Sequence, residues 1–195
     1  MIIVGIDVGY INMGVVRVST DDKLNFQFID AFRYNISIVK HNTVPVQECI
    51  IPHTTETCDR VEHFIQENKF IFESADHILI ERQPPMGLKD IEALLMNKYR
   101  SKVQLISPNK LHKYFNIRHL SYEERKDFVE EIATPHIGHI HEFITQERKH
   151  DMADAACMCI YFIMKLKKEQ LKKEKLENIK RLPFEDYAFV QPGDI

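Results

Sequence analysis

The sequence has 195 residues, of which 44% are hydrophobic and 28% are charged, and its formal net charge is −3. This length and composition are ordinary for one well-cored globular domain, or for one domain with an appendage. No apolar run approaches the ~20 residues of a membrane-spanning helix, and the N-terminus lacks the basic start and cleavage site of a signal peptide. We therefore expect neither a membrane span nor a secretory leader.

The charge is distributed unevenly along the chain. Residues 165–181 contain eight basic and three acidic side chains, a net of +5, whereas residues 182–195 contain three acids and no Lys or Arg. The mildly acidic total therefore does not exclude a nucleic-acid partner, because a local site can still be neutral or positive. The four cysteines are not spaced as a disulfide framework or a zinc motif, which favours reduced thiols in an intracellular compartment.

The N-terminal part of the chain is predicted to form three strands. Residues 2–8 are apolar and rich in β-branched side chains, which is typical of a strand that is buried on both faces. Residues 13–19 and 25–32 follow as further strands separated by a tight turn, so the pattern predicts an antiparallel meander. Residues 33–56 are interrupted by two prolines and fit no regular element, and we interpret them as an insertion or excursion.

Helices and strands alternate in the rest of the chain. Short apolar strands are predicted at residues 78–81 and 103–106, the first of them central and parallel to the N-terminal strand. Ser121 and Glu124 have the spacing of a capping box, which opens a helix. In the last helix, apolar residues recur at i, i+3, i+4 and i+7 from Met152. A meander followed by this alternation predicts an α/β fold, a mixed sheet covered by helices.

Four acidic residues lie where these elements begin or end. Asp7 and Glu81 each end an apolar run, and Asp151 and Asp154 are three residues apart at the start of the last helix. An acid at the end of a buried strand is costly unless a cation or hydrogen bonds compensate it. The helical pair places two like charges on one face. For that pair alone, ordinary acids in a solvated first turn explain the spacing equally well.

Together, the four acids favour a metal site. Carboxylates are the ligands that hard divalent ions such as magnesium prefer. Two ions held about 3.5–4 Å apart can activate a water molecule and stabilise the leaving oxygen of a phosphodiester. We therefore predict a two-metal phosphodiester-cutting site, in which Asp7 bridges both ions while Glu81, Asp151 and Asp154 complete their coordination.

Several segments carry a resemblance to a known family, in the same order along the chain. Three of them resemble the RuvC-like Holliday-junction resolvases: Ile-Val-Gly-Ile-Asp7-Val-Gly, Ile-Leu-Ile-Glu81-Arg-Gln-Pro and Lys149-His-Asp151-Met-Ala-Asp154-Ala. The poxvirus-type branch is resembled especially by Glu81-Arg-Gln-Pro, Ser121-Tyr-x-x-Arg-Lys126 and Arg148-Lys-x-Asp151-x-x-Asp154. The resemblance covers residues 1–32 and 74–166.

The resemblance implies an RNase H-like fold with a five-stranded mixed sheet over residues 1–166. Residues 167–195 are then a basic helical extension and an acidic tail that the family does not explain. The family acts as a homodimer and uses magnesium or manganese, two ions per active site, to nick four-way DNA junctions symmetrically. Its four catalytic acids match the four acids above. A poxvirus-type enzyme would act in the host cytoplasm.

Basic residues near the acids are candidates for DNA contacts. The lysine that the family places near the scissile phosphate matches Lys126 best, and Lys110 in Ser107-Pro-Asn-Lys is a second candidate. Arg82, Lys89 and Lys149 flank the acidic segments and are expected to position the DNA backbone without reading its sequence. An ordinary solvated helix lysine explains Lys110 equally well, and explains Lys126 less well.

A histidine cluster gives a weaker signal. His136, His139 and His141 form an H-x-x-H-x-H pattern, but Pro135 and Gly138 are expected to interrupt any helix there. We therefore interpret the cluster as a surface loop and not as a metal site.

Two other functions remain open at this point. An RNase H-type nuclease acting on RNA–DNA hybrids uses the same set of acids. An ATPase of the actin-hexokinase type also carries Asp-x-Gly in its first strand-turn-strand, as in Asp7-Val-Gly9, with Gly14 following. Such ATPases need a second lobe of comparable size, and 195 residues leave little room for one.

Overall fold

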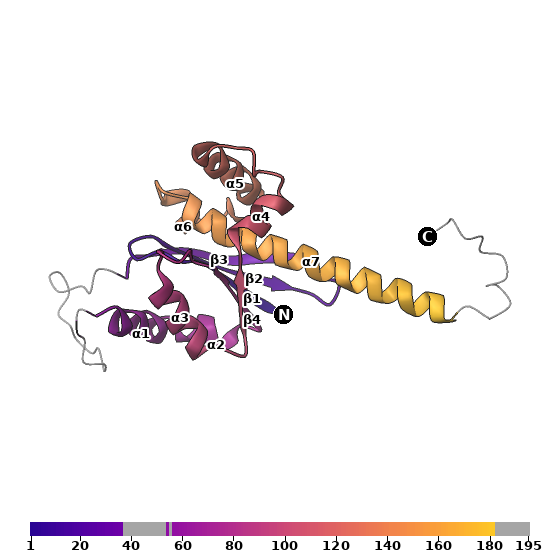
Figure 1. Ribbon diagram of the computed structural model, residues 1–195, viewed down its shortest axis with the longest axis horizontal. Helices are drawn as coiled ribbons and strands as arrows, with labels where there is room; N and C mark the ends of the chain where they lie inside the picture. Colours follow the sequence, from indigo (N-terminus) through magenta and orange to yellow (C-terminus); the bar gives the residue numbers. More distant parts are fainter. Residues whose placement is uncertain (37–53, 55, 182–195) are drawn as a thin grey trace.

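The structure, a computed structural model, describes residues 1–36, 54 and 56–181. Its centre is a five-stranded sheet in the order β3-β2-β1-β4-β5 (Figure 1). The strands are β1 (Ile2–Asp7), β2 (Met13–Thr20), β3 (Phe26–Tyr34), β4 (His77–Glu81) and β5 (Val103–Ile106). The first three form the predicted antiparallel meander, and β4 and β5 join it as parallel strands. The predicted mixed sheet is confirmed.

Helices cover both faces of this sheet. They are α1 (Thr57–Glu67), α2 (Lys69–Ser74), α3 (Lys89–Lys98), α4 (Pro108–Tyr114), α5 (Tyr122–Ile137), α6 (His141–Thr145) and α7 (His150–Arg181). The first three lie on one face and the last four on the other (Figure 1). Alternate residues of β1 point to opposite faces of the sheet: Ile3 packs with α7 on one face, and Val4 packs with α1 and α3 on the other. Burial on both faces explains the continuous apolar runs of the central strands.

The first part of α7 contributes more buried residues to its layer of the core than any other helix does. The predicted apolar stripe packs against β1 and β2. Its fully buried members are Met152, Ala155, Ala156, Cys159 and Ile163. The small side chains among them allow a close approach to the sheet. The helix then continues without a break to Arg181.

The structure corrects the expectation that Pro135 and Gly138 prevent a helix near residue 135. Pro135 lies inside α5, which continues to Ile137 and ends at Gly138. A proline in a helix removes one N–H donor and crowds the preceding turn. Here it falls in the last turn, where the buried contacts of Val129 and Ala133 in the core that α5 shares with α7 hold the helix together.

Two predicted segments lie partly or wholly outside the described residues. β3 extends to Tyr34, so regular structure continues into the predicted insertion, and α1 begins at Thr57. Residues 37–53 and 55 of that insertion, and the acidic tail at 182–195, are not described and stay predictions. In the described part of the chain, no helix is both long and apolar enough to cross a membrane.

Candidate active site

Asp7 and Glu81 lie side by side at one edge of the sheet. Their strands are adjacent and parallel, and Ile6 pairs with Ile80, so the next residue of each strand reaches the same edge. The two carboxyl groups share a hydrogen bond. Glu81 also accepts a hydrogen bond from Nε2 of Gln83 at 3.0 Å. The ends of two apolar strands therefore place two acids in direct contact.

Two glycines let α7 approach the sheet closely enough to bring its acids to the same edge. Gly14 pairs with Asp7 across the β1–β2 ladder. A Cβ on Gly14 would lie 2.0 Å from the carbonyl oxygen of Asp151, and a Cβ on Gly5 would lie 2.5 Å from that of Ala155. Any larger residue at these positions would push the helix outward. The glycines therefore set where the helical acids lie.

The four acids act on one another electrostatically. Burial raises the pKa of Asp7 well above its usual range, and the charges of the other three acids raise it further. Burial also raises the pKa of Glu81, although its hydrogen bonds to Asp7 and Gln83 oppose that shift. The pKa of Asp154 rises to about 7, first through burial and then through the charges of Glu81 and Asp151. Carboxylates that share a site in this way ionise together only at a cost.

Arg148 binds the fourth acid, Asp151. Its Nε donates to one carboxylate oxygen at 2.6 Å and its Nη2 donates to the other at 3.0 Å. The side chain of Asp151 is 7% exposed and that of Arg148 is 41% exposed, so the pair lies at the rim of the site. Bidentate pairs of this kind are among the stronger polar contacts in proteins. The arginine supplies positive charge where a metal ion would.

The donor set fits hard divalent cations, although the site is not arranged for them in advance. Within the described residues, no three His, Cys, Asp or Glu side chains already form a metal-binding group. Two contacts account for this, because Arg148 occupies both oxygens of Asp151 and because Asp7 and Glu81 bond to each other. All four donors are nonetheless carboxylates, and a cation would relieve the repulsion that, after burial, raises the pKa values of Asp7 and Asp154. The four acids would hold it.

Lys126 lies at this site. Its charge opposes the rise in the pKa of Asp154. Burial lowers the pKa of His150, and the charges of Arg148 and Lys126 lower it further. The Nζ of Lys126 lies 4.0 Å from the ring centroid of Tyr122 and 3.7 Å from a carboxylate oxygen of Glu123. The capping box at Ser121, with both of its hydrogen bonds formed, fixes the start of α5 and so the place of this lysine.

The other predicted DNA contacts lie in different surroundings. Lys110 is exposed on α4, and Arg82 is exposed directly after Glu81. Lys149 lies beside the acids in sequence, with its Nζ 5.6 Å from the ring centroid of Phe143. Lys89 instead pairs with the buried Glu92 at 2.8 Å. Its role in the structure is therefore to hold the loop after Glu81.

Sequence reasoning missed the residues that orient this loop and the helical acids. Glu92 is 7% exposed and accepts a hydrogen bond from the backbone N–H of Gln83 at 2.6 Å. That contact holds Gln83 where its amide donates to Glu81. Glu92 follows Gln83 by nine residues, a spacing that no local motif marks as a contact. Arg148 was visible as part of a motif, but its contact with Asp151 was not.

Among the residues that the structure describes, His136, His139 and His141 are not gathered into a group of metal ligands. His136 lies in α5, with its ring centroid 5.2 Å from that of Phe26, so its expected place in a surface loop was wrong. Burial lowers its pKa. His139 and His141 are exposed. Of the histidines, His150 lies beside the candidate active site. Its Nε2 is buried without a hydrogen-bond partner and lies 3.8 Å from a carboxylate oxygen of Asp151.

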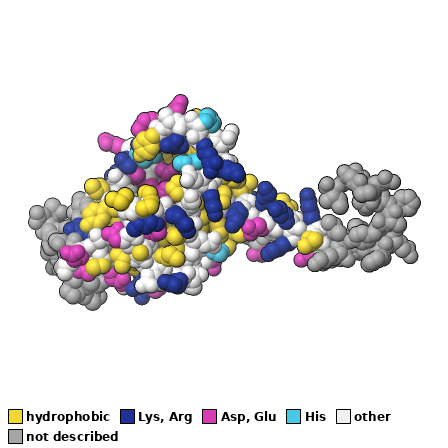
Figure 2. All heavy atoms as spheres, viewed as in Figure 1, with side chains coloured by type: hydrophobic (Ala, Val, Ile, Leu, Met, Phe, Trp, Pro, Cys, Tyr) yellow, Lys and Arg dark blue, Asp and Glu magenta, His cyan; other side chains and the backbone are white. Residues whose placement is uncertain are grey.

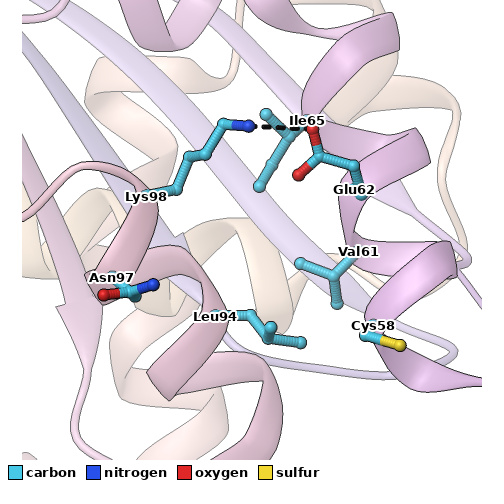
Figure 3. Close-up of a pocket in the computed structure, with 7 residues that line it drawn as sticks. All are labelled: Cys58, Val61, Glu62, Ile65, Leu94, Asn97 and Lys98. Carbon is cyan, nitrogen blue, oxygen red and sulfur yellow. Dashed lines mark hydrogen bonds and ion pairs between the residues drawn. The ribbon is translucent and has the colours of Figure 1, made fainter.

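A separate small cavity lies between α1 and α3, on the opposite face of the sheet from α7 (Figure 3). Its volume is about 110 Å³, and none of the four acids lines it. Lys98 and Glu62 close one side through an ion pair of 2.8 Å. It is therefore distinct from the candidate active site.

Comparisons with known proteins establish the fold. No family model and no curated protein sequence matches this chain. The Fowlpox virus resolvase in complex with Holliday junction DNA has a similar structure, with a TM-score of 0.62 at 13% identity over 85% of this chain and 99% of that one. A yeast mitochondrial Holliday junction resolvase gives 0.61 at 17% identity over 92% and 86%. RuvC of Thermus thermophilus in complex with Holliday junction substrate gives 0.51 at 15% over 81% and 90%. The chain therefore has the RNase H-like fold that these resolvases share.

Proposed function

We propose that this protein is a metal-dependent endonuclease that cuts four-way DNA junctions by hydrolysing one phosphodiester in each of two strands. The observation that carries the proposal is the convergence of four carboxylates at one sheet edge. Support comes from the fold, which resembles that of three Holliday-junction resolvases. Asp7, Glu81, Asp151 and Asp154 are the proposed catalytic and metal-binding residues.

The residues around the acids have distinct proposed tasks. Magnesium or manganese, when bound, supplies an activated water and stabilises charge on the leaving oxygen. Asp7 interacts with Glu81 on the neighbouring strand and with both helical acids, so it would contribute to both parts of the site. Gln83 orients the carboxylate of Glu81 through its hydrogen bond. Lys126, beside Asp154, provides a positive charge for the scissile phosphate.

Arg148 has two proposed positions in this reaction. Without metal it neutralises Asp151. Were Asp151 to serve as a metal ligand, the guanidinium would be free at the rim of the site, where it could bind two phosphate oxygens in the same bidentate manner. The exposure of its side chain leaves it room to do so.

We also propose that the protein acts as a homodimer, because paired symmetric nicks need two active sites related by a two-fold axis. The helix after Glu81, α3, is one candidate for the dimer face. Its apolar residues Ile91 and Leu95 are buried in the core of their own chain and are not available for a dimer contact. Met86 and Met96 remain exposed on and near α3. Sedimentation equilibrium of the wild type tests the dimer, which a monomer at all concentrations would contradict.

A cleavage assay tests the proposed reaction. The substrates are a synthetic four-way junction, a linear duplex of the same sequence and an RNA–DNA hybrid, each with magnesium and with EDTA. We expect magnesium-dependent nicks in the junction, little cutting of the duplex, and no activity in an Asp7→Asn variant. Asp22→Asn, which changes an exposed acid in a turn, is the matched control. Equal cutting of the hybrid and the junction would favour an RNase H-type nuclease instead.

A further inference from the structure

The second half of α7 projects beyond the sheet and has little to pack against (Figure 1). Every residue from 168 to 178 is exposed. The helix nevertheless continues unbroken to Arg181. A projecting helix has no core to pack against, so the distribution of its side chains around the axis indicates what it can bind.

Four of the lysines of this arm share one face. Lys165, Lys168, Lys172 and Lys175 follow one another at intervals of three and four residues. At 3.6 residues per turn, these four lie within about 80° of one another around the helix axis. We call these four residues the lysine stripe. Figure 2 shows basic side chains along the projecting helix on the face in view.

The remaining side chains of the arm show no comparable order. Leu166, Leu171 and Leu176 are spaced by five residues, so they spread around the axis at intervals of about 80–140° and form no apolar seam. The arm therefore lacks the stripe that a coiled-coil partner would need. Glu174 and Glu177 lie about 140–160° from the centre of the lysine stripe. Four lysines of the arm therefore lie on one side with Glu174 and Glu177 opposite them, whereas Lys167 and Lys173 lie outside the stripe.

Internal ion pairs leave most of the stripe available. Lys165 pairs with Glu169 at 3.6 Å. Glu174 accepts a hydrogen bond from Gln170 on the other side of the helix. Lys167, which is outside the stripe, lies with its Nζ 5.9 Å from the ring centroid of Phe26. Lys168, Lys172 and Lys175 are exposed, and they form no ion pair with the side chains that the structure describes.

The stripe also lies in line with the active-site acid on the same helix. Asp154, Met158 and Tyr161 precede Lys165 at intervals of four, three and four residues. A repeat of this kind drifts by only ~20° per heptad, so Asp154 and the stripe share one broad face. At a rise of 1.5 Å per residue, Lys168 lies about 21 Å and Lys175 about 32 Å along the axis from Asp154. That span equals about 6 to 9 base pairs of duplex.

α4 packs on α7 between these two regions. The rings of Tyr114 and Tyr161 meet with centroids 5.2 Å apart. α4 exposes Lys110 and Lys113. The surface between the acids and the stripe therefore continues to carry positive charge.

We propose that the lysine stripe binds the phosphate backbone of one duplex arm of the branched DNA, about 6 to 9 base pairs from the cleavage site. This inference rests on the proposed function and adds a substrate contact to it. The stripe would hold the arm without reading bases, since exposed lysines act as point charges. It would also favour junctions with arms long enough to reach it.

Binding of fluorescent junctions to the full-length protein in EDTA tests the stripe. The matched pair is Lys172→Glu and Lys173→Glu, which change net charge equally at two exposed neighbours that lie about 100° apart on the helix. We expect Lys172→Glu to weaken binding to a junction with arms of about 20 base pairs at least fivefold more than Lys173→Glu. The triple variant Lys168→Gln, Lys172→Gln, Lys175→Gln should reduce the slope of log affinity against log salt by about 2.7.

Arm length provides the second readout. Junctions with arms of about five base pairs end before the stripe, so the triple variant should bind them as tightly as the wild type does. Circular dichroism should show unchanged helix content, because glutamine forms helices about as well as lysine. Equal effects of the two charge reversals, or an unchanged salt slope, would overturn the proposal and leave an acidic protein as the alternative partner. If the wild type cuts no junction but the stripe variants still lose DNA binding, the proposed function fails and the stripe stands.

Discussion

Replacing Asp154 by asparagine should stabilise the metal-free protein at alkaline pH. The pKa of Asp154 is about 7 in the folded protein against an ordinary value of 3.8. Between these values the folded state binds more protons than the unfolded state, so the free energy of unfolding falls as pH rises. A difference of about three pKa units corresponds to about 4 kcal/mol, and solvent screening around this half-buried group reduces it to about 2–3 kcal/mol. That penalty is absent below pH 4 and complete above pH 8.

Urea unfolding in EDTA at pH 5.5 and pH 8.0 measures the effect. Wild type should lose stability between these pH values, whereas Asp154→Asn should lose less and be more stable than wild type at pH 8.0. Asp127→Asn is the control, because it removes an exposed acid from α5. An Asp154→Asn protein that is less stable than wild type at pH 8.0 in EDTA would refute the electrostatic account of the site.

Magnesium should reverse the order of the two proteins. A ligand that binds only the folded state adds about 4.1 kcal/mol when its concentration is 1,000 times its dissociation constant, which exceeds the penalty of about 2–3 kcal/mol at Asp154. Wild type should gain this stability at pH 8.0, and Asp154→Asn should gain much less because it lacks one proposed ligand. Equal gains would remove Asp154 from the metal site while leaving its pKa intact as an explanation of the pH dependence.

Three further changes test how the site is held in place. Gly14→Ala places a Cβ 2.0 Å from the carbonyl oxygen of Asp151, so it should cost about 1–3 kcal/mol in urea unfolding and abolish cleavage; near-normal activity would contradict the close approach. Arg148→Ala should lower stability in EDTA but tighten magnesium binding in calorimetry, because a competing cation is lost; weaker magnesium binding would show that the arginine orients Asp151 for the metal. Ser121→Ala should cost about 1 kcal/mol through loss of the capping box, and an unchanged midpoint of urea unfolding would contradict it.

Some of this architecture could be predicted because its causes are local in sequence. The strand ends at Asp7 and Glu81 stand out because apolar runs stop at an acid, and their parallel pairing brings the two together. The capping box at Ser121 was correct for the same reason, since its two hydrogen bonds span only three residues. Local rules failed at Pro135, where burial of the α5 face against α7 outweighs the cost of a proline in the last turn.

Other features depend on contacts between distant parts of the chain. The approach of Asp151 to Gly14 joins residues that are far apart in sequence, and no local pattern marks Gly14 as a contact site. The contact of Glu92 with the N–H of Gln83 depends on how the loop after β4 folds back on α3. These contacts set the position of the acids, and only the packed structure provides them.

The acids converge because the core overcomes their repulsion. Asp151 and Asp154 are carried on a helix whose inner face is fully buried at Met152, Ala155 and Ala156. Burying such side chains contributes about 25 cal/mol for each Å² of apolar surface removed from water. Moving the helix away to separate the carboxylates would expose that surface, so the charges remain together, and burial followed by their repulsion raises the pKa values of Asp7 and Asp154. A site built in this way is under electrostatic strain until a cation reaches it, which is why metal affinity and the pH dependence of stability should change together.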